Sequence, residues 1–371
     1  MTSAQTFAPA LVREAAVAGQ FYPGAKAELD ATVRNFLDHA EAGQDSPAVP
    51  PAVPKAIIAP HAGYVYSGAV AAAAYALLTP AAATIKRVVL LGPCHRVSVQ
   101  GLALSGARAF RTPLGDIPVD KDAARQILDF PGVQVFDATH ELEHSLEVHL
   151  PFLQIVLDDF TLVPLVVGQA TPGDVADVLD ALWGGPETLI VISTDLSHYL
   201  DYDAARSLDA DTCRAIEALD AGAISSDGAC GRFPVGGLLE AAKRKGLVVA
   251  TLELCNSGDT AGPKDRVVGY GSWAFTQATP EANAETSSET PSETKALLDQ
   301  YGENLLGLAA QSIKHGWKNG KPLRVDTDGS PGELLLHGAC FVTLDRKSTR
   351  LNSSHVVISY DVLCLSITIA R

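Results

Sequence analysis

The sequence predicts an α/β fold with a central mixed, largely parallel sheet flanked by helices. Apolar runs of strand length recur along the chain without strict alternation, which indicates strands covered on both faces. Segments with helical apolar spacing lie between several of these runs. The chain has 371 residues, of which 47% are hydrophobic, so it is long enough for one large core or two ordinary ones.

The first strand signal lies in residues 55–68, KAIIAPHAGYVYSG, which follow a helical pattern at residues 27–39 and a Pro-rich connector. The isoleucines of this stretch predict a buried strand, and Pro60 cannot continue a central ladder. Two glycines then loosen the turn before an Ala-rich helix, which we expect to begin near Ala69. His61 is therefore predicted at the carboxyl end of a strand.

Five more strand signals and several helical patterns follow along the chain. The strand signals are IKRVVLLGPCHR, FTLVPLVVGQA, TLIVISTDLSHY, LVVATLELCNSGD and RVVGYGSWAF. The helical patterns include DAARQILDF, DVADVLDALW and DADTCRAIEAL. We therefore assign residues 1–276 to one α/β domain. Residues 277–294, QATPEANAETSSETPSET, have almost no large apolar side chain and predict a disordered linker.

Charge and cysteine content limit the partners and the compartment. The formal charge of −15 and a pI near 5.0 argue against general electrostatic attraction to nucleic acid or anionic lipid. The six cysteines form no CxxC pair and are too few for a disulfide scaffold, which indicates a reducing compartment. No basic leader precedes an apolar run, and a proline interrupts the Ala-rich segment. We therefore predict a cytoplasmic protein without a membrane span.

Polar residues follow four of the predicted strands. His61 and His95 each come directly after a strand broken by proline, Asp195 and His198 follow TLIVIS, and Cys255 follows LVVATLEL. One such histidine is more often structural than functional. Because the carboxyl ends of strands in open α/β sheets border the ligand crevice, we expect these side chains to converge.

Two imidazoles with a carboxylate or a thiolate form a donor set suited to Fe(II), Zn or Cu. A site of two histidines and one carboxylate with open positions is typical of non-haem iron oxygenases. Cys255 as a thiolate would instead favour copper or zinc, or a thiol chemistry of its own. Cys94, beside His95, is a further soft donor within reach.

Residues 140–144, HELEH, match the letters of the zinc-protease motif H-E-x-x-H. That motif needs a helix already running at the first histidine, whereas the preceding strand pattern ends only at residues 137–139. We therefore do not assign a zinc protease. His144, Glu147 and His149 fit better as pocket-lining residues, with exposed helix positions as the alternative. No G-x-S-x-G elbow, phosphate-binding loop or nucleotide fingerprint is found.

Several segments together resemble the Memo family, whose bacterial members are called AmmeMemoRadiSam system protein B. The similar segments are AVAGQFYPG, APHAGYVYSG, LLGPCHR, EHSLEVHLPFLQ, STDLSHY, CGRFPVGG and the segment around Cys255. The match runs in order over residues 13–275. The resemblance implies a fold like that of the class III extradiol dioxygenases and a pocket that binds iron or copper through two histidines and a cysteine.

Carried onto this chain, the resemblance implies His61, His95 and Cys255 as metal ligands. It implies Asp195 and His198 as the catalytic pair beside them, with His198 as acid and base. Five residues are expected to line the pocket: Tyr64, Cys94, His144, Glu147 and His149. The dioxygenases have a carboxylate where this set has a thiol, which argues against true dioxygenase activity.

The C-terminal part is similar to a different family. Residues 295–345 resemble the start of an AMMECR-type domain (AmmeMemoRadiSam system protein A), and the similarity stops abruptly, which implies a truncated fragment. Residues 346–371 resemble the translation of a sequencing adapter, with a genuine terminal strand as the alternative. The resemblance implies a radical-SAM protein and an AMMECR-type protein as partners.

These observations predict a Memo-type metal-binding protein. Its His/His/Cys pocket would support redox chemistry or serve a radical-SAM partner. Two alternatives stay open, a non-haem iron extradiol-type dioxygenase and a non-catalytic module that binds a peptide or partner. Whether the chain is an enzyme, its metal and its small-molecule substrate are not decided by the sequence.

Overall fold

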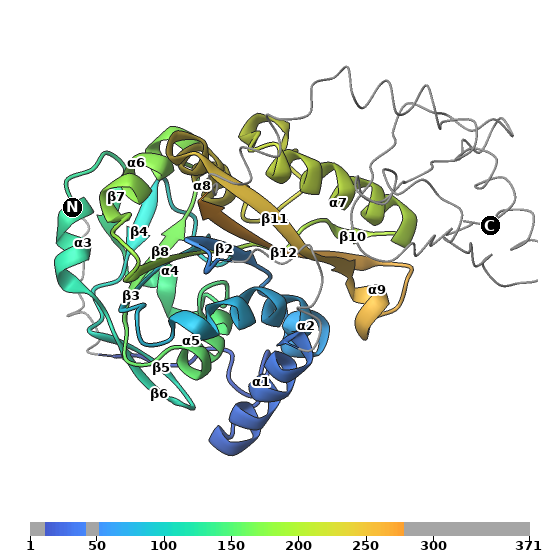
Figure 1. The fold of residues 1–371 in the computed structure, drawn as a ribbon, viewed down its shortest axis with the longest axis horizontal. Helices are drawn as coiled ribbons and strands as arrows, with labels where there is room; N and C mark the ends of the chain where they lie inside the picture. Colours follow the sequence, from blue (N-terminus) through green and yellow to red (C-terminus); the bar gives the residue numbers. More distant parts are fainter. Residues whose placement is uncertain (1–11, 42–51, 278–371) are drawn as a thin grey trace, which may run out of the picture. The chain divides into compact units, whose positions relative to one another are not determined.

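The computed structural model describes residues 12–41 and 52–277 of the chain. A mixed sheet runs through the middle of this part, with helices on both faces (Figure 1). The predicted α/β class, with a sheet of many strands flanked by helices, is therefore confirmed.

The large sheet has nine strands in the described part of the chain, in the order β10-β12-β2-β9-β3-β8-β4-β7, with β11 paired to β12. The four strands β2, β9, β3 and β8 are parallel and form its centre, whereas β12 and β4 run antiparallel to that block on either side. The bounds are β2 Ala56–Ala59, β3 Arg87–Pro93, β4 Leu102–Leu104, β7 Val133–Val135, β8 Thr161–Val167, β9 Thr188–Ser193, β10 His198–Leu200, β11 Leu247–Asn256 and β12 Val267–Gln277.

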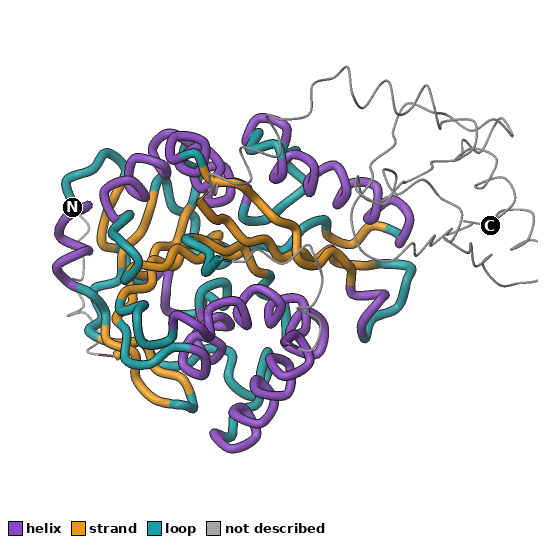
Figure 2. The backbone as a smooth tube through the Cα atoms, viewed as in Figure 1, coloured by secondary structure: helices purple, strands orange, loops and turns teal. Residues whose placement is uncertain are grey.

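Helices on the two faces of the sheet close two separate hydrophobic cores (Figure 2). The first core lies under α1 Lys26–Glu41, α2 Tyr64–Tyr75 and α5 Leu150–Val156. The second lies under α3 Lys121–Ile127, α6 Pro172–Leu182, α7 Tyr202–Glu217 and α8 Arg232–Lys245. Burial on both faces explains why the central strands are almost wholly apolar. The shorter helices are α4 Ala138–Glu141, α9 Ser257–Thr260, η1 Ala76–Ala81, η2 Glu147–His149 and η3 Ala221–Ala223.

A small second sheet ties the N-terminal segment to the domain. It consists of β1 Val12–Arg13, β5 Ala109–Thr112 and β6 Gly115–Pro118. Arg13 forms a buried ion pair with Glu147, whose carboxylate also accepts hydrogen bonds from the backbone of Ala16 and Val17 and from the Tyr22 hydroxyl. Four donors thus satisfy this buried carboxylate, and the segment before α1 is fixed against the core.

All six strands expected from the apolar runs are present, as β2, β3, β8, β9, β11 and β12. The helix expected near Ala69 begins earlier, at Tyr64, because Gly63 already provides its N-cap. The strand expected just before residues 137–139 is present as β7, which ends earlier, at Val135. The sequence did not predict the short strands β1, β4, β5, β6 and β10, which have two to four residues each and depend on their pairing partners. Residues 278–294 of the expected linker, the AMMECR-type fragment at 295–345 and the tail at 346–371 lie outside the described residues.

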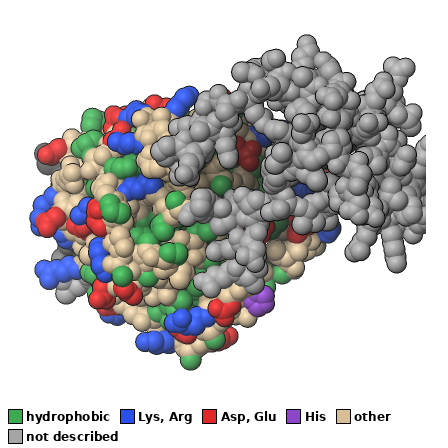
Figure 3. Space-filling view, in the orientation of Figure 1, with side chains coloured by type: hydrophobic (Ala, Val, Ile, Leu, Met, Phe, Trp, Pro, Cys, Tyr) green, Lys and Arg blue, Asp and Glu red, His purple; other side chains and the backbone are tan. Residues whose placement is uncertain are grey.

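Within the described residues, no helix is both long enough and apolar enough to cross a bilayer. On the face drawn in Figure 3, Lys and Arg side chains lie among Asp and Glu side chains, so neither sign dominates the coloured surface.

His140, the first residue of the HELEH stretch, is a core histidine. Its Nε2 donates a hydrogen bond to the carbonyl oxygen of Ala103, and its ring packs edge-on against Phe110. Its side chain is buried, whereas Glu141 is exposed to solvent. Two of the three residues that a zinc protease of this motif would need therefore lie in different environments, which argues against such an enzyme. Burial lowers the pKa of His140 from its ordinary value of 6.5 to about 4.

The lowered pKa of His140 predicts acid sensitivity of the fold. Between pH 6.5 and 4 the unfolded chain binds a proton that the folded chain excludes, so the free energy of unfolding falls as the pH falls. We expect the loss between pH 7.5 and pH 5 to be about 2 kcal/mol smaller in His140→Gln than in the wild type. Urea unfolding at both pH values measures this difference, and an equal loss in both proteins would contradict it.

Candidate metal centre

Three neighbouring parallel strands deliver the polar residues of the site. In the order β2-β9-β3, the strands end at Ala59, Ser193 and Pro93. His61, Asp195 and His95 each follow two residues after these ends. Since parallel strands end at the same edge of a sheet, the three side chains meet there, as the sequence predicted.

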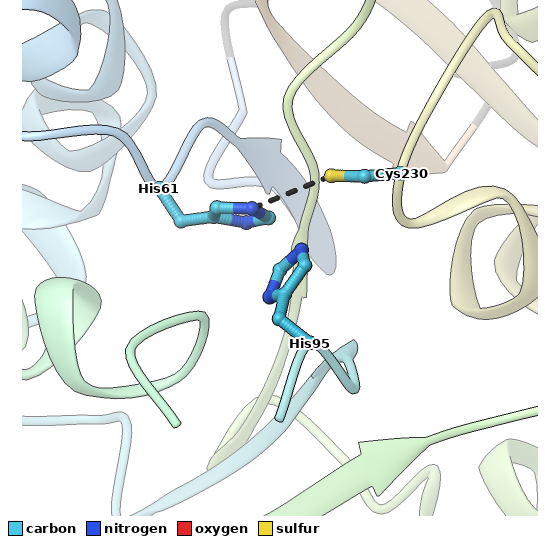
Figure 4. A group of neighbouring side chains, drawn as sticks. All are labelled: His61, His95 and Cys230. Atoms are coloured by element: carbon cyan, nitrogen blue, oxygen red, sulfur yellow. Dashed lines mark hydrogen bonds between the residues drawn. The ribbon is translucent and has the colours of Figure 1, made fainter. Parts of the chain in front are cut away.

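A cysteine completes this group, and it is Cys230. The potential ligand atoms of His61, His95 and Cys230 all lie within 4.8 Å of one another. Cys230 Sγ lies 3.3 Å from His61 Nε2, and the three side chains point toward a common centre from separate segments (Figure 4). A possible metal-binding group is therefore present at this edge of the sheet.

The loop before α8 brings Cys230 to this edge. The Cys230 amide donates to the carbonyl oxygen of Asp195 over 3.2 Å, and the Gly231 amide donates to Thr194 Oγ1 over 2.9 Å. A Cβ atom built on Gly231 would lie 2.5 Å from the carbonyl oxygen of Ser193, so only glycine allows this approach. The sequence signal for this ligand is the pair Cys-Gly directly before a helix, in the segment CGRFPVGG. This segment is among those similar to the Memo family, but its cysteine was not predicted as a ligand.

Cys255, the cysteine expected as a ligand, is not part of the group. It lies on β11 opposite Tyr270, and β12 separates β11 from β2. Two strand spacings amount to about 10 Å across the sheet, which is too far for a ligand shared with His61. The sequence placed Cys255 correctly near a strand end, but it could not show that β11 lies outside the central strands.

Hydrogen bonds fix the tautomer of His61. The Ser193 hydroxyl donates to the carbonyl oxygen of Ser145 over 2.6 Å, so its oxygen accepts from His61 Nδ1, also over 2.6 Å. His61 therefore carries its proton on Nδ1 and directs the Nε2 lone pair toward Cys230. Burial, reinforced by the neighbouring histidines, lowers the pKa of His61 well below its ordinary value, which keeps the ring neutral.

Glu143 orients His95 in the same way. Its carboxylate accepts from His95 Nδ1 over 2.8 Å and from the His95 amide over 2.6 Å. Burial opposes ionisation of Glu143, but the bonds from His95 and Ser145 outweigh it and lower the pKa to about 2. The ionised carboxylate requires a proton on His95 Nδ1, so the Nε2 lone pair is free for a ligand.

His144 lies beside the group without joining it. Its ring stacks on His95 with centroids 4.7 Å apart, and its Nδ1 has no hydrogen-bond partner among the described residues. His95, Glu143 and His144 form a second set of close ligand atoms. However, the Glu143 carboxylate already accepts four hydrogen bonds, from His95 Nδ1 and from the amides of His95, His144 and Ser145. This second set is therefore a support for His95 rather than a separate metal site.

Asp195 borders the group, and His198 follows three residues later, at the start of β10. Asp195 accepts from the His61 amide over 2.8 Å, and its other oxygen lies 3.8 Å from His61 Nε2. Burial raises the pKa of Asp195 to about 7 despite the amide hydrogen bonds. His198 Nδ1 donates to the carbonyl oxygen of Leu196 over 2.8 Å, which leaves Nε2 as a free acceptor, and burial lowers its pKa.

The other residues expected to line the pocket serve mainly as its support. Glu147 anchors the N-terminal segment, as described above. The Tyr64 hydroxyl donates to the carbonyl oxygen of Val148 over 2.7 Å, and His149 Nδ1 is 2.8 Å from the Tyr75 hydroxyl. Cys94 bonds to the carbonyl oxygen of Val97 next to His95. None of these four contributes an atom to the His61, His95 and Cys230 group.

The donor atoms of this site suit a transition metal. Two imidazoles direct Nε2 toward a thiol, and burial raises the pKa of Cys230 to about 12. The site alone therefore holds a protonated thiol against His61, and a bound metal would replace that proton. Two nitrogens and one sulfur suit iron, copper or zinc, and three protein ligands leave coordination positions open.

Comparison with known proteins gives matches over the described domain. The family model described as Memo-like protein matches residues 13–274. A MEMO1 family protein of Aeropyrum pernix is 34% identical over 285 residues, covering 70% of this chain and 98% of that protein. A MEMO1 family protein of Aquifex aeolicus is 35% identical over 273 residues, covering 70% and 97%. An uncharacterized Escherichia coli K12 protein of known structure is similar with a TM-score of 0.41 at 13% identity, covering 59% and 98%.

The close approach of Gly231 gives a test of the loop that carries Cys230. Gly231→Ala should lower the free energy of unfolding by about 1–3 kcal/mol, because its Cβ would clash with the Ser193 carbonyl and with Thr194. The control is Gly173→Ala in α6, where a Cβ has no atom nearer than 3.8 Å and should be neutral or stabilising. Urea unfolding compares the two variants, and equal stability would show that the loop does not depend on this contact.

Proposed function

The chain belongs to the Memo-like protein family, and we propose that it binds one redox-active metal ion, iron or copper, through His61, His95 and Cys230. The observation that supports this most is the meeting of three ligand atoms within 4.8 Å, each from a different segment of the chain. The proposed ligand set keeps the two histidines expected from the sequence and replaces Cys255 with Cys230.

The surroundings of both histidines support a metal rather than a structural role. His61 is held through Nδ1 by Ser193, and His95 is held through Nδ1 by Glu143. Metal-binding histidines in proteins are usually held in this way, because a partner on one nitrogen fixes the ring and makes the other nitrogen a better ligand. Here the partners of both histidines direct the two free Nε2 atoms toward the same thiol, an arrangement that a purely structural role does not need.

The metal would supply Lewis acidity and a redox couple at the open positions. The residues around it would supply proton transfer and orientation. His198, with Nε2 free, accepts a proton from a substrate hydroxyl and returns it later. Asp195 holds the backbone of His61 and so keeps the first ligand in place. Burial of His61 and Asp195 excludes water from this side of the centre.

The resemblance to the family leaves two proposed functions for such a centre. In the first, it catalyses an oxidation, with an extradiol-type dioxygenase as the specific alternative. In the second, it has no turnover of its own and serves a radical-SAM protein together with an AMMECR-type protein, in the cytoplasm. The free Nε2 of His198 favours catalysis, whereas the thiol ligand favours the second use because dioxygenases of that type have a carboxylate there.

Metal binding should depend on Cys230 and not on Cys255. Anaerobic titration of the full-length chain with Fe(II) or Cu(I) should give one ion per chain. We expect His61→Ala and Cys230→Ser to weaken binding at least about 100-fold, because each removes a ligand. Cys255→Ser is the matched control and should bind like the wild type. Unchanged metal content in Cys230→Ser would refute the proposed ligand set.

Replacing His198 separates catalysis from metal binding. If the centre catalyses oxidation, His198→Gln should keep the metal and lower the oxygen uptake with a catechol probe by a factor of about 100 or more. An oxygen electrode measures the uptake, and metal analysis of the same samples is the control. A wild-type protein that holds metal and consumes no oxygen would instead favour service of a partner.

A further inference from the structure

The backbone at Tyr199, next to His198, is strained. Tyr199 has a φ of 61°, in the left-handed region that bulky residues rarely adopt. It is the extra residue of a bulge, since His198 pairs with Val268 and Leu200 with Val267. Glycine is the usual residue at such a position. The bulge turns the Tyr199 side chain away from the regular ladder.

Leu219 is the other non-glycine residue with a positive φ in the described part of the chain, and the fold accounts for it. Leu219 follows α7, where a left-handed residue commonly ends a helix, and its side chain packs against the second core. The Tyr199 side chain is 64% exposed, and its hydroxyl forms no hydrogen bond with a described residue. Unlike Leu219, Tyr199 does not bury its side chain in a hydrophobic core, and its ring contacts only Arg266 and His198 among the described residues.

Two neighbours define which parts of the Tyr199 ring are covered. The Arg266 guanidinium lies 5.1 Å from the ring centroid, and the His198 ring stands edge-on with centroids 5.8 Å apart. Arg266 forms no ion pair with a described residue, so the contact with the ring is its main interaction. His198 pairs with Val268 of β12, and β2, which leads to His61, pairs with the same strand further along. Asp195, three residues before His198, accepts a hydrogen bond from the His61 amide. The exposed ring therefore stands next to the segment that borders the metal group.

We propose that Tyr199, strained and exposed beside His198, is a specificity residue that stacks on a planar part of a ligand held at the metal centre. The inference rests on the proposed function. Backbone strain and bulges concentrate where a side chain is redirected toward a site, and an exposed aromatic face binds planar groups of many kinds. Arg266 holds the ring in place from one side.

The charged side chains around Tyr199 give no preference for an anionic ligand. Arg266 directly follows Asp265 in the sequence, and Asp201 and Asp203 lie where β10 passes into α7. Two further cations, Lys264 and Arg206, lie over the ring of Tyr202 in the same region. Basic and acidic side chains are therefore mixed here, so charge of one sign does not select the ligand. We therefore assign a planar aromatic or conjugated group as the ligand class.

Two hydroxamates test the proposal, because both chelate a metal and only one has a ring. The full-length chain loaded with iron should bind benzohydroxamate about fivefold more tightly than acetohydroxamate. In Tyr199→Asn this advantage should fall below twofold, whereas Tyr199→Phe, which keeps the ring, should retain it. Acetohydroxamate affinity should be the same in all three proteins. Absorbance titration gives the dissociation constants.

Stability and metal content provide independent readouts. Asparagine tolerates a positive φ, so Tyr199→Asn should raise the unfolding midpoint of the metal-free protein by about 3 °C. A full benzohydroxamate advantage in Tyr199→Asn, or a lowered midpoint, would overturn the proposal. Equal metal content in all variants would show that a changed hydroxamate affinity comes from residue 199 and not from a loss of metal. A wild type without metal would refute the centre itself, and the specificity role with it.

Discussion

One buried carboxylate organises both histidines of the site. Glu143 accepts hydrogen bonds from the amide and Nδ1 of His95 and from the amide of Ser145. Ser145 in turn accepts the Ser193 hydroxyl that fixes His61, and its own hydroxyl donates to the carbonyl oxygen of Pro93 at the end of β3. Because the carboxylate is ionised and buried, each of these donors must stay in place to satisfy it. The loop around Glu143 thus sets the direction of both free nitrogens.

The sheet topology explains why such a loop can reach both histidines. The strands β2, β9 and β3 are adjacent and parallel, so His61, Asp195 and His95 leave the sheet at one edge. Helices on both faces bury these strands, which makes the edge rigid and keeps the geometry of the side chains fixed. The cysteine comes from outside the sheet, on the loop before α8, and the close packing of Gly231 sets its position.

The site combines a neutral interior with a strained, exposed rim. Burial favours uncharged His61 and His198 and a protonated Cys230, and the proposed metal ion would replace the thiol proton. At the rim, Tyr199 adopts an unfavourable backbone conformation while its ring remains in solvent. The proposed metal would therefore lie inside the site, and the proposed planar ligand would contact the ring at its edge.

The sequence alone determined the six strands with apolar runs, the α/β class and the residues at the ends of those strands, because apolar runs broken by Pro or Gly are local signals. His61, His95, Asp195 and His198 were therefore found correctly near one edge. Only the tertiary structure decided which cysteine joins them. Cys255 and Cys230 both follow plausible local patterns, and the choice depends on the position of β11 beyond β12 and on the packing of α8 against β9. The roles of Glu143, Glu147 and Tyr199 likewise depend on long-range pairing and backbone conformation, for which a single sequence carries no local signal.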